Sequence, residues 1–216
     1  LVDGTRFVVA DSFALARRVA ETLGRIRGLD LPRRAAAIRE EKFDVIFTGV
    51  QSDDMAFGQT GTLLAQRLGW PHATIVMERS YTASPQRVFK AWADVEARMR
   101  WSAPADNIRI VYEASDFREG GKDISRCIEP GNEDYVAAVT YIDIKRDQRI
   151  FFVEDVTHGE KRVSAALISV ELTPNGAGTR LVLTMQIASF DEAGMEHGYQ
   201  FGWNAALDNL AEEFTA

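Results

Sequence analysis

Apolar and polar positions follow two different patterns along the chain, and the change falls near Pro71-His72. Before it, short apolar runs at residues 6–10 and 44–49 alternate with segments whose apolar residues recur every three or four positions. Those segments predict helices at about residues 12–27, 33–42 and 59–68. Because strands that alternate with helices form parallel sheets, we expect a small α/β segment with parallel strands over residues 1–71.

After residue 72, long strand-like runs replace this alternation. Gly, Pro and Asn turn signals separate the runs, which predicts an antiparallel meander. The expected strands are residues 73–81, 108–117, 123–128, 135–145, 149–156, 163–173 and 180–189. Short helices are expected to start at Ser84-Pro85 and at Asp94, which can cap the helix reaching Trp101.

The end of the chain carries a continuous apolar stripe at steps of three and four residues. Its members are Tyr199, Trp203, Leu207, Leu210 and Phe214. The stripe predicts a long C-terminal helix packed on the sheet. Residues 72–216 are therefore expected to form an α+β domain in which a curved antiparallel sheet wraps that helix.

Several ordered motifs in this second half resemble a known superfamily. They are HATIVMERSYTASPQRVFKAW at 72–92, DFREGG at 116–121, VELTPNGAGTRLVLT at 170–184 and GYQFGWNAALDNL at 198–210. Together they are similar to the START-like (SRPBCC) ligand-binding domains, in the branch related to the activator of the Hsp90 ATPase. The resemblance implies a helix-grip fold with an apolar cavity between sheet and helix, and a small hydrophobic ligand or a protein client as partner.

The first half contains a second likeness. DVIFTGVQSDDMAFGQTGTLLAQRLGWP at 44–71 resembles a fragment of the electron transfer flavoprotein β subunit, in which a helix beginning at Gln-Thr-Gly holds a phosphate of AMP. Unpaired amides at a helix N-terminus suit such an anion. The resemblance therefore implies that Gly58, Gln59, Thr60 and Gly61 bind the nucleotide, and that residues 1–71 are a truncated form of that module. A fusion segment without a function of its own is the alternative.

Composition narrows the classes of partner. The 216 residues are 46% hydrophobic and carry a net charge of -7, which argues against general attraction to nucleic acid or anionic membranes. No apolar run approaches the roughly 20 residues that span a bilayer. We expect a cytoplasmic protein. Its single cysteine, Cys127, excludes an internal disulfide framework.

Residues that could carry catalysis do not converge in the sequence. Cys127 has no histidine nearby in sequence, and His158 and His197 are expected to be solvated or capping residues. Glu154 and Asp155 are adjacent in a strand, so their side chains should point to opposite faces of the sheet. We expect a binding protein rather than an enzyme, without a metal or a cofactor, unless the first half holds AMP.

Bulky aromatic residues are the candidates for ligand contact. A sheet curled on a helix encloses space, and Trp and Tyr at its edge can orient a ligand with their polar atoms. The candidate ligand-binding residues are Trp92, Trp101, Tyr135, Phe151, Phe201 and Trp203. The leading hypothesis is binding of a small apolar ligand or a protein client by residues 72–216, and the alternative is nucleotide binding by residues 1–71.

Overall fold

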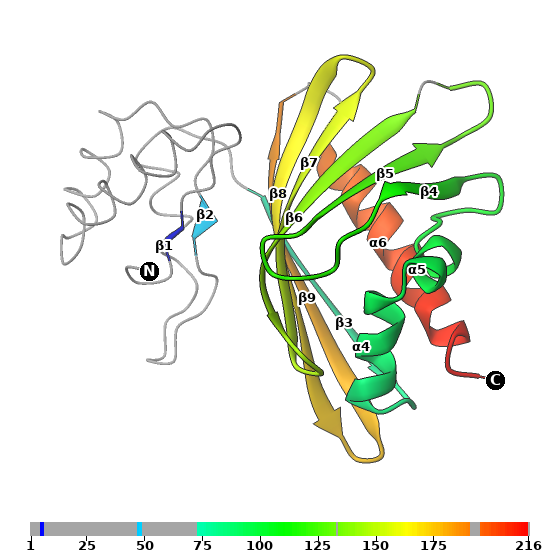
Figure 1. The fold of residues 1–216 in the computed structure, drawn as a ribbon, viewed down its shortest axis with the longest axis vertical. Helices are drawn as coiled ribbons and strands as arrows, with labels where there is room; N and C mark the ends of the chain where they lie inside the picture. The colour runs from blue at the N-terminus through cyan, green and yellow to red at the C-terminus, as the bar shows by residue number, and fades with distance from the viewer. Residues whose placement is uncertain (1–4, 7–46, 49–72, 133, 191–194, 216) are drawn as a thin grey trace. The chain divides into compact units, whose positions relative to one another are not determined.

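The C-terminal part of the chain forms a curved seven-stranded sheet around one long helix (Figure 1). The structure is a computed structural model that describes residues 5–6, 47–48, 73–132, 134–190 and 195–215. The chain divides into two compact units, Leu1–Ala73 and Thr74–Ala216.

Within the first unit, the two described strands are β1 (Thr5–Arg6) and β2 (Phe47–Thr48). They pair antiparallel, with Thr5 opposite Thr48, where the sequence pattern predicted parallel strands. Alternation of strand and helix does not fix strand direction, which depends on how the intervening chain returns to the sheet. The three helices predicted for this unit lie outside the described residues.

In the second unit the strand order is β3-β9-β8-β7-β6-β5-β4. The strands are β3 (Ala73–Tyr81), β4 (Arg109–Ala114), β5 (Lys122–Ile128), β6 (Tyr135–Lys145), β7 (Arg149–His158), β8 (Lys161–Asn175) and β9 (Gly178–Ser189). From β4 to β9, each strand pairs antiparallel with the next one in the chain. This confirms the predicted α+β fold, an antiparallel sheet wrapped on a C-terminal helix.

The first strand of this unit, β3, lies beside the last one, β9. Residues 73–77 therefore belong to the antiparallel sheet, as part of the strand predicted over residues 73–81. Gly178 in β9 permits the close approach of the chain that follows β3, because a Cβ there would lie 2.1 Å from the backbone oxygen of Tyr81.

Two short helices, α4 (Pro85–Ala93) and α5 (Val95–Trp101), follow β3. Pro85 occupies the first turn of α4, after Ser84 at the N-cap, as the sequence predicted. Asp94 ends α4 and caps α5, since its carboxylate accepts hydrogen bonds from the amides of Glu96 at 2.9 Å and Ala97 at 3.3 Å. One aspartate therefore sets the bend between the two helices.

The long helix α6 (Met195–Glu212) supplies the centre of the core. The predicted stripe is confirmed, since Tyr199, Leu207, Leu210 and Phe214 are buried and Trp203 is half-buried. Fully buried residues of the sheet and of α4 pack around it: Val88, Ile150, Ile168, Leu181, Leu183 and Met185. This burial of apolar surface is the main stabilising term of the unit.

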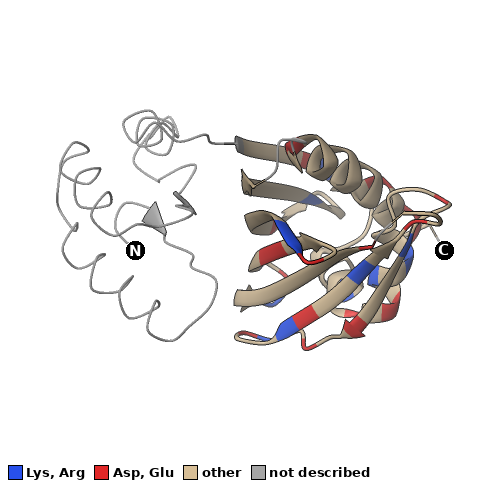
Figure 2. Ribbon diagram, turned by 90° about the horizontal axis from the view of Figure 1, so that it is seen from above, with Lys and Arg blue, Asp and Glu red and all other residues tan. Residues whose placement is uncertain are grey.

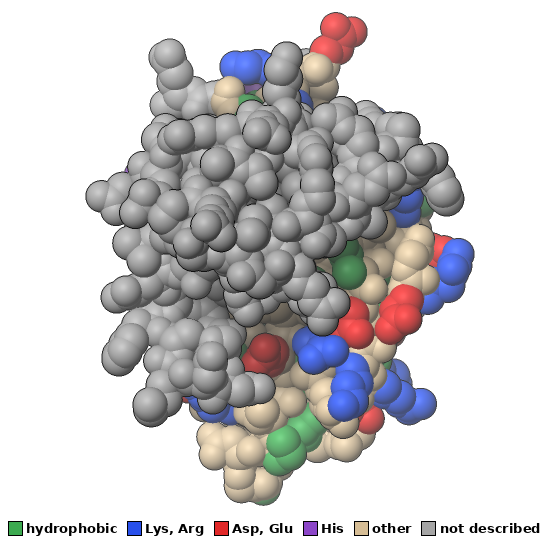
Figure 3. Space-filling model, turned by 90° about the vertical axis from the view of Figure 1, so that its left-hand side faces the viewer, with side chains coloured by type: hydrophobic (Ala, Val, Ile, Leu, Met, Phe, Trp, Pro, Cys, Tyr) green, Lys and Arg blue, Asp and Glu red, His purple; other side chains and the backbone are tan. Residues whose placement is uncertain are grey.

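Charged residues of both signs are interspersed over the surface of this unit (Figure 2). Arg180 pairs with Glu78 at 2.5 Å and Arg149 with Asp143 at 2.7 Å, both on the sheet. On the described part of the face in Figure 3, basic and acidic side chains lie side by side with a few apolar ones. No single-sign patch stands out on the described residues in these views.

We expect a shortened chain that begins at His72 to fold, because the sheet and its helix form one compact unit from Thr74 onward. The measurement is urea unfolding followed by tryptophan fluorescence, and a single cooperative transition is the expected result. An insoluble or gradually unfolding product would show that residues 1–71 complete the core.

Candidate functional site

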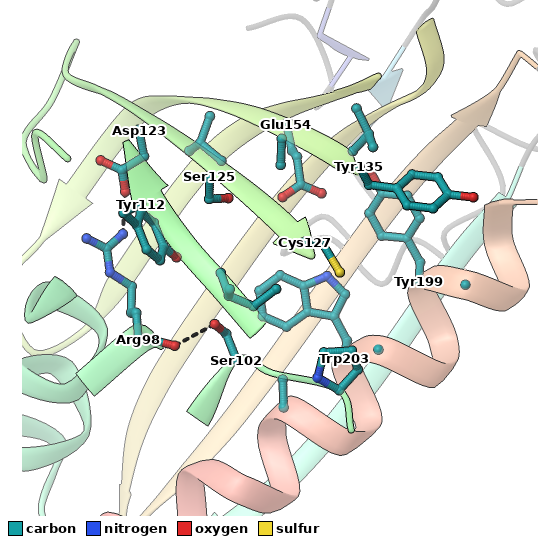
Figure 4. Close-up of a pocket in the computed structure, with 18 of the residues that line it drawn as sticks. Arg98, Ser102, Tyr112, Asp123, Ser125, Cys127, Tyr135, Glu154, Tyr199 and Trp203 are labelled. Carbon is teal, nitrogen blue, oxygen red and sulfur yellow. Dashed lines mark hydrogen bonds and ion pairs between the residues drawn. The ribbon is translucent and has the colours of Figure 1, made fainter. Parts of the chain in front are cut away.

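A cavity of about 520 Å³ lies between the concave face of the sheet and α6. Strands β4 to β7 form one wall, and α5 and α6 form the other. Figure 4 shows the side chains of Ser125 and Glu154 projecting from the sheet into this space and the Trp203 indole projecting from the helix. The volume lies within the range of about 300–1,000 Å³ usual for sites that bind small molecules.

Space remains here because both walls carry small side chains where they face each other. Ser125 and Ala137 are directly opposite on β5 and β6, and Val139 is the next residue on the same face. Gly198 and Gly202 face the cavity from α6, one helical turn apart. A Cβ added at either glycine would meet no other atom within 4 Å, so the space in front of them is open.

Five of the six aromatic residues predicted from the sequence line this cavity. They are Trp92, Trp101, Tyr135, Phe201 and Trp203. Phe151 is not among them, and Phe152 takes its place. Successive side chains of a strand point to opposite faces, and the sequence alone did not decide which of the two phenylalanines faces inward. Whether the five residues bind a ligand stays a prediction.

The lining aromatic residues differ in how far they are packed. Trp92 and Trp101 are 4% and 2% exposed, with ring centroids 4.9 Å apart. Trp203 stacks on Trp92 at 5.7 Å with an angle of 10° between the rings. Tyr135 and Phe201 are 39% and 65% exposed, so they border the opening of the cavity. Trp92, Trp101 and Trp203 therefore form one packed cluster. Tyr135 and Phe201 lie at the mouth of the cavity.

A buried ion pair closes one end of the cavity, and sequence reasoning missed it. Arg98 of α5 donates from Nη1 to Asp123 Oδ2 on β5 and, at 2.7 Å, to the hydroxyl of Tyr141 on β6. The Tyr141 hydroxyl donates to Asp123 Oδ2 at 2.6 Å. Arg98 Nη2 donates to Ser115 Oγ at 2.7 Å, and the guanidinium carbon lies 4.7 Å from the Tyr112 ring centroid. The network joins α5 to three strands.

Glu154 on β7 is the second charged group of the cavity, and sequence reasoning considered it only as a neighbour of Asp155. None of the ion pairs between described residues includes its carboxylate. Burial raises the pKa of Glu154 to about 7, a hydrogen bond with Tyr199 opposes this rise, and the charge of Asp155 adds to it. Asp155 instead pairs with Arg162 at 2.6 Å, so the two adjacent carboxylates point to opposite faces, as predicted.

The remaining candidates for chemistry do not form a catalytic set with Glu154. Cys127 lines the cavity, and burial raises the pKa of its thiol. His158 stacks on Tyr135 at 4.4 Å, and His197 is exposed in the first turn of α6. Within the ranges that the structure describes, no group of three or more His, Cys, Asp or Glu could hold a metal ion.

The predicted nucleotide-binding residues, Gly58, Gln59, Thr60 and Gly61, lie outside the described residues.

Comparison with known families decides where the chain belongs. The family described as Activator of Hsp90 ATPase homolog 1-like protein matches residues 82–215. The chain belongs to this family. Solved structures agree: the Mll3558 protein from Rhizobium loti is 39% identical, with a TM-score of 0.60, over 66% of this chain and 97% of that one.

Two further solved structures share the fold. A protein from Rhizobium leguminosarum is 31% identical over 66% of this chain and 94% of its own, with a TM-score of 0.60. The CV1439 protein from Chromobacterium violaceum is 20% identical over 64% of this chain and 94% of its own, with a TM-score of 0.57. None of the helices that the structure describes is long and apolar enough to cross a membrane.

The second resemblance is also supported. The electron transfer flavoprotein domain family matches residues 33–103. The β subunit of electron transfer flavoprotein from Methylophilus methylotrophus is 46% identical over 44 residues, which are 20% of this chain. The chain spans 17% of the length of that subunit.

Removing one partner of the buried ion pair should be strongly destabilising. Arg98 and Asp123 side chains are 5% and 2% exposed, so Asp123→Ala leaves a buried, unpaired charge and should lower the free energy of unfolding by about 3–5 kcal/mol. Tyr141→Phe, which removes one hydroxyl, should lower the free energy of unfolding by about 1 kcal/mol. Urea unfolding measures both. A loss below about 1 kcal/mol for Asp123→Ala would contradict this account.

Stability should also depend on the proton of Glu154. The raised pKa means that the folded state favours the protonated acid, so this contribution is complete below about pH 4.5 and is lost as the pH rises through about 7. The stability of Glu154→Gln relative to the unsubstituted protein should therefore rise by about 3 kcal/mol between pH 4.5 and pH 8. The control is Glu171→Gln, an exposed glutamate on β8. Equal pH profiles for both variants would refute the assignment.

Proposed function

We propose that the cavity of the second unit binds a small apolar ligand. The observation that carries this proposal is the pair Gly198 and Gly202, which lie in a helix and face open space. Gly202 lies in the interior of the helix, where glycine costs about 1 kcal/mol relative to alanine, and an alanine methyl there would meet nothing. The sequence therefore keeps a cavity open at the expense of helix stability, which is expected of a binding site.

The walls of the cavity suit an apolar molecule. Trp92, Trp101, Phe152 and Val156 supply buried apolar surface, and the charged groups of the lining are Arg98, Asp123, Glu129 and Glu154. Such a distribution gives affinity through burial and orientation through a small number of hydrogen bonds.

A protein client is a weaker interpretation of the same unit. Its recognition would call for a continuous exposed apolar surface. The large exposed apolar side chains among the described residues are instead distributed over several elements: Val76, Val111, Tyr135, Ile142, Phe190 and Phe201. Of these, Tyr135 and Phe201 border the cavity, where they can close over a small ligand.

Nucleotide binding by the first unit is a second candidate function. The match to the electron transfer flavoprotein domain and the 46% identity over 44 residues favour it. In this proposal Gly58, Gln59, Thr60 and Gly61 hold a phosphate of AMP at the start of a helix.

Filling the cavity should abolish uptake of an uncharged probe. N-phenyl-1-naphthylamine becomes fluorescent in apolar surroundings, and we expect saturable binding to the unsubstituted protein. Gly202→Leu places a side chain in the open space and should weaken binding by about tenfold or more, the equivalent of about 1.4 kcal/mol. Fluorescence titration measures the effect, with thermal unfolding to show that the variant is folded.

The matched control is Gln200→Leu, which adds the same side chain at an exposed position of the same helix. It should leave probe binding unchanged. If the unsubstituted protein takes up no probe, while AMP raises its stability and Thr60→Ala abolishes that effect, nucleotide binding replaces ligand binding as the function.

A further inference from the structure

The charges that line the cavity do not balance. Arg98 is its one basic side chain among the described lining residues, and it is paired with Asp123. The two other acids, Glu129 and Glu154, take part in none of the ion pairs between described residues. Glu129 accepts a hydrogen bond from Asn132 at 2.7 Å, but this amide brings no charge. With Arg98 neutralised, the remaining charge of the cavity is negative.

Aromatic side chains border this acidic cavity. Tyr135 and Phe201 lie at the mouth, Trp203 lies on the helical wall, and Tyr199 contacts Glu154 directly. The face of an aromatic ring carries partial negative charge and attracts cations. A ring that turns its face to the ligand and a carboxylate that no described basic side chain neutralises therefore favour the same sign of ligand.

We propose that the ligand is an apolar molecule with one ammonium group, and that this cation pairs with the carboxylate of Glu154 inside the cavity. The inference rests on the proposed function, since it assigns the class of ligand to the same cavity. An anionic ligand of the same shape would meet two acids without a free base. An uncharged ligand would leave Glu154 without a counter-charge in an apolar space, which favours its protonation.

The other titratable groups near Glu154 come from every element around it. They are Asp155 on β7 itself, Tyr199 on α6, Tyr112 on β4, Arg98 on α5, Asp123, Cys127 and Glu129 at β5, and Tyr135 and Tyr141 on β6, with His158 stacked on Tyr135. Burial raises the pKa values of Tyr112, Tyr141, Tyr199 and Cys127, away from neutral pH. Substitution of Glu154 itself separates its contribution to the pH dependence from that of the other groups.

The affinity of the cavity for an ammonium ligand should rise with pH. Ammonium binding needs the ionised carboxylate, and with a pKa of about 7 the ionised fraction of Glu154 rises about tenfold between pH 6 and pH 8. Affinity for a cation that stays protonated over this range should rise by the same factor. Affinity for an uncharged ligand should not.

The experiment uses the full chain and four naphthalenes that compete with N-phenyl-1-naphthylamine. 2-(Aminomethyl)naphthalene and 2-ethylnaphthalene have nearly the same shape and differ in charge, 2-naphthoate is anionic, and 2-acetylnaphthalene is an uncharged hydrogen-bond acceptor. At pH 8 the amine should bind about tenfold or more tightly than 2-naphthoate, a difference of about 1.4 kcal/mol.

Glu154→Gln should lower the affinity for the amine by about tenfold at pH 8 and abolish the pH dependence of that affinity. The affinity for 2-ethylnaphthalene should stay within about twofold of its value in the unsubstituted protein. Because this variant keeps the shape and removes a buried charge, it should fold, and its thermal unfolding checks this. Glu171→Gln, which removes a charge outside the cavity, should change none of the affinities. The pH dependence of the unsubstituted protein is a test that needs no variant.

The outcomes separate this inference from the proposed function. If 2-ethylnaphthalene and the fluorescent probe both fail to bind, the proposed function is wrong. If both compounds bind, but the amine binds no more tightly than 2-naphthoate or Glu154→Gln leaves the affinity for the amine unchanged, only the ammonium assignment is overturned. Binding of 2-acetylnaphthalene that weakens as pH rises and is lost in Glu154→Gln would also overturn it, because Glu154 would then be a neutral donor.

Discussion

The buried pair of Arg98 and Asp123 is the interaction on which the shape of the cavity depends. It joins α5 to β5, and through Tyr141 to β6, at the end of the sheet opposite β3. On the other side, Arg79 of β3 donates to Asp208 of α6 at 2.8 Å. Both sides of the curved sheet are thus held to helices by charged groups. The cavity lies between these two attachments, where neither side packs fully against the other.

The open space has a cost that the rest of the unit offsets. Gly202 weakens α6, Glu154 is half-buried without a basic partner among the described residues, and small residues such as Ala137 leave apolar walls apart. Close packing of Leu181, Leu183 and Leu207 at the other end of α6 compensates for these losses. The features that weaken packing therefore all line the cavity, as expected of a binding site.

Local patterns predicted much of this fold. The stripe from Tyr199 to Phe214, the cap at Asp94 and the start of α4 at Pro85 each depend on residues close in sequence. The strand predicted over residues 73–81 is likewise part of the antiparallel sheet. Phe151 was misplaced because two adjacent phenylalanines fit either face of a strand, and only pairing with neighbouring strands decides between them.

The sequence by itself determined the order of strands and helices, the helical stripe and the aromatic residues available to a cavity, because these depend on spacing along the chain. The tertiary structure decided the direction of β1 and β2, the pairing of Arg98 with Asp123 and the surroundings of Glu154. The physical reason is that charge pairing and desolvation depend on atoms brought from distant segments. The sequence shows that Glu154 and Asp155 face opposite sides of a strand, but which of the two lies in the cavity depends on the side of the sheet that faces α6.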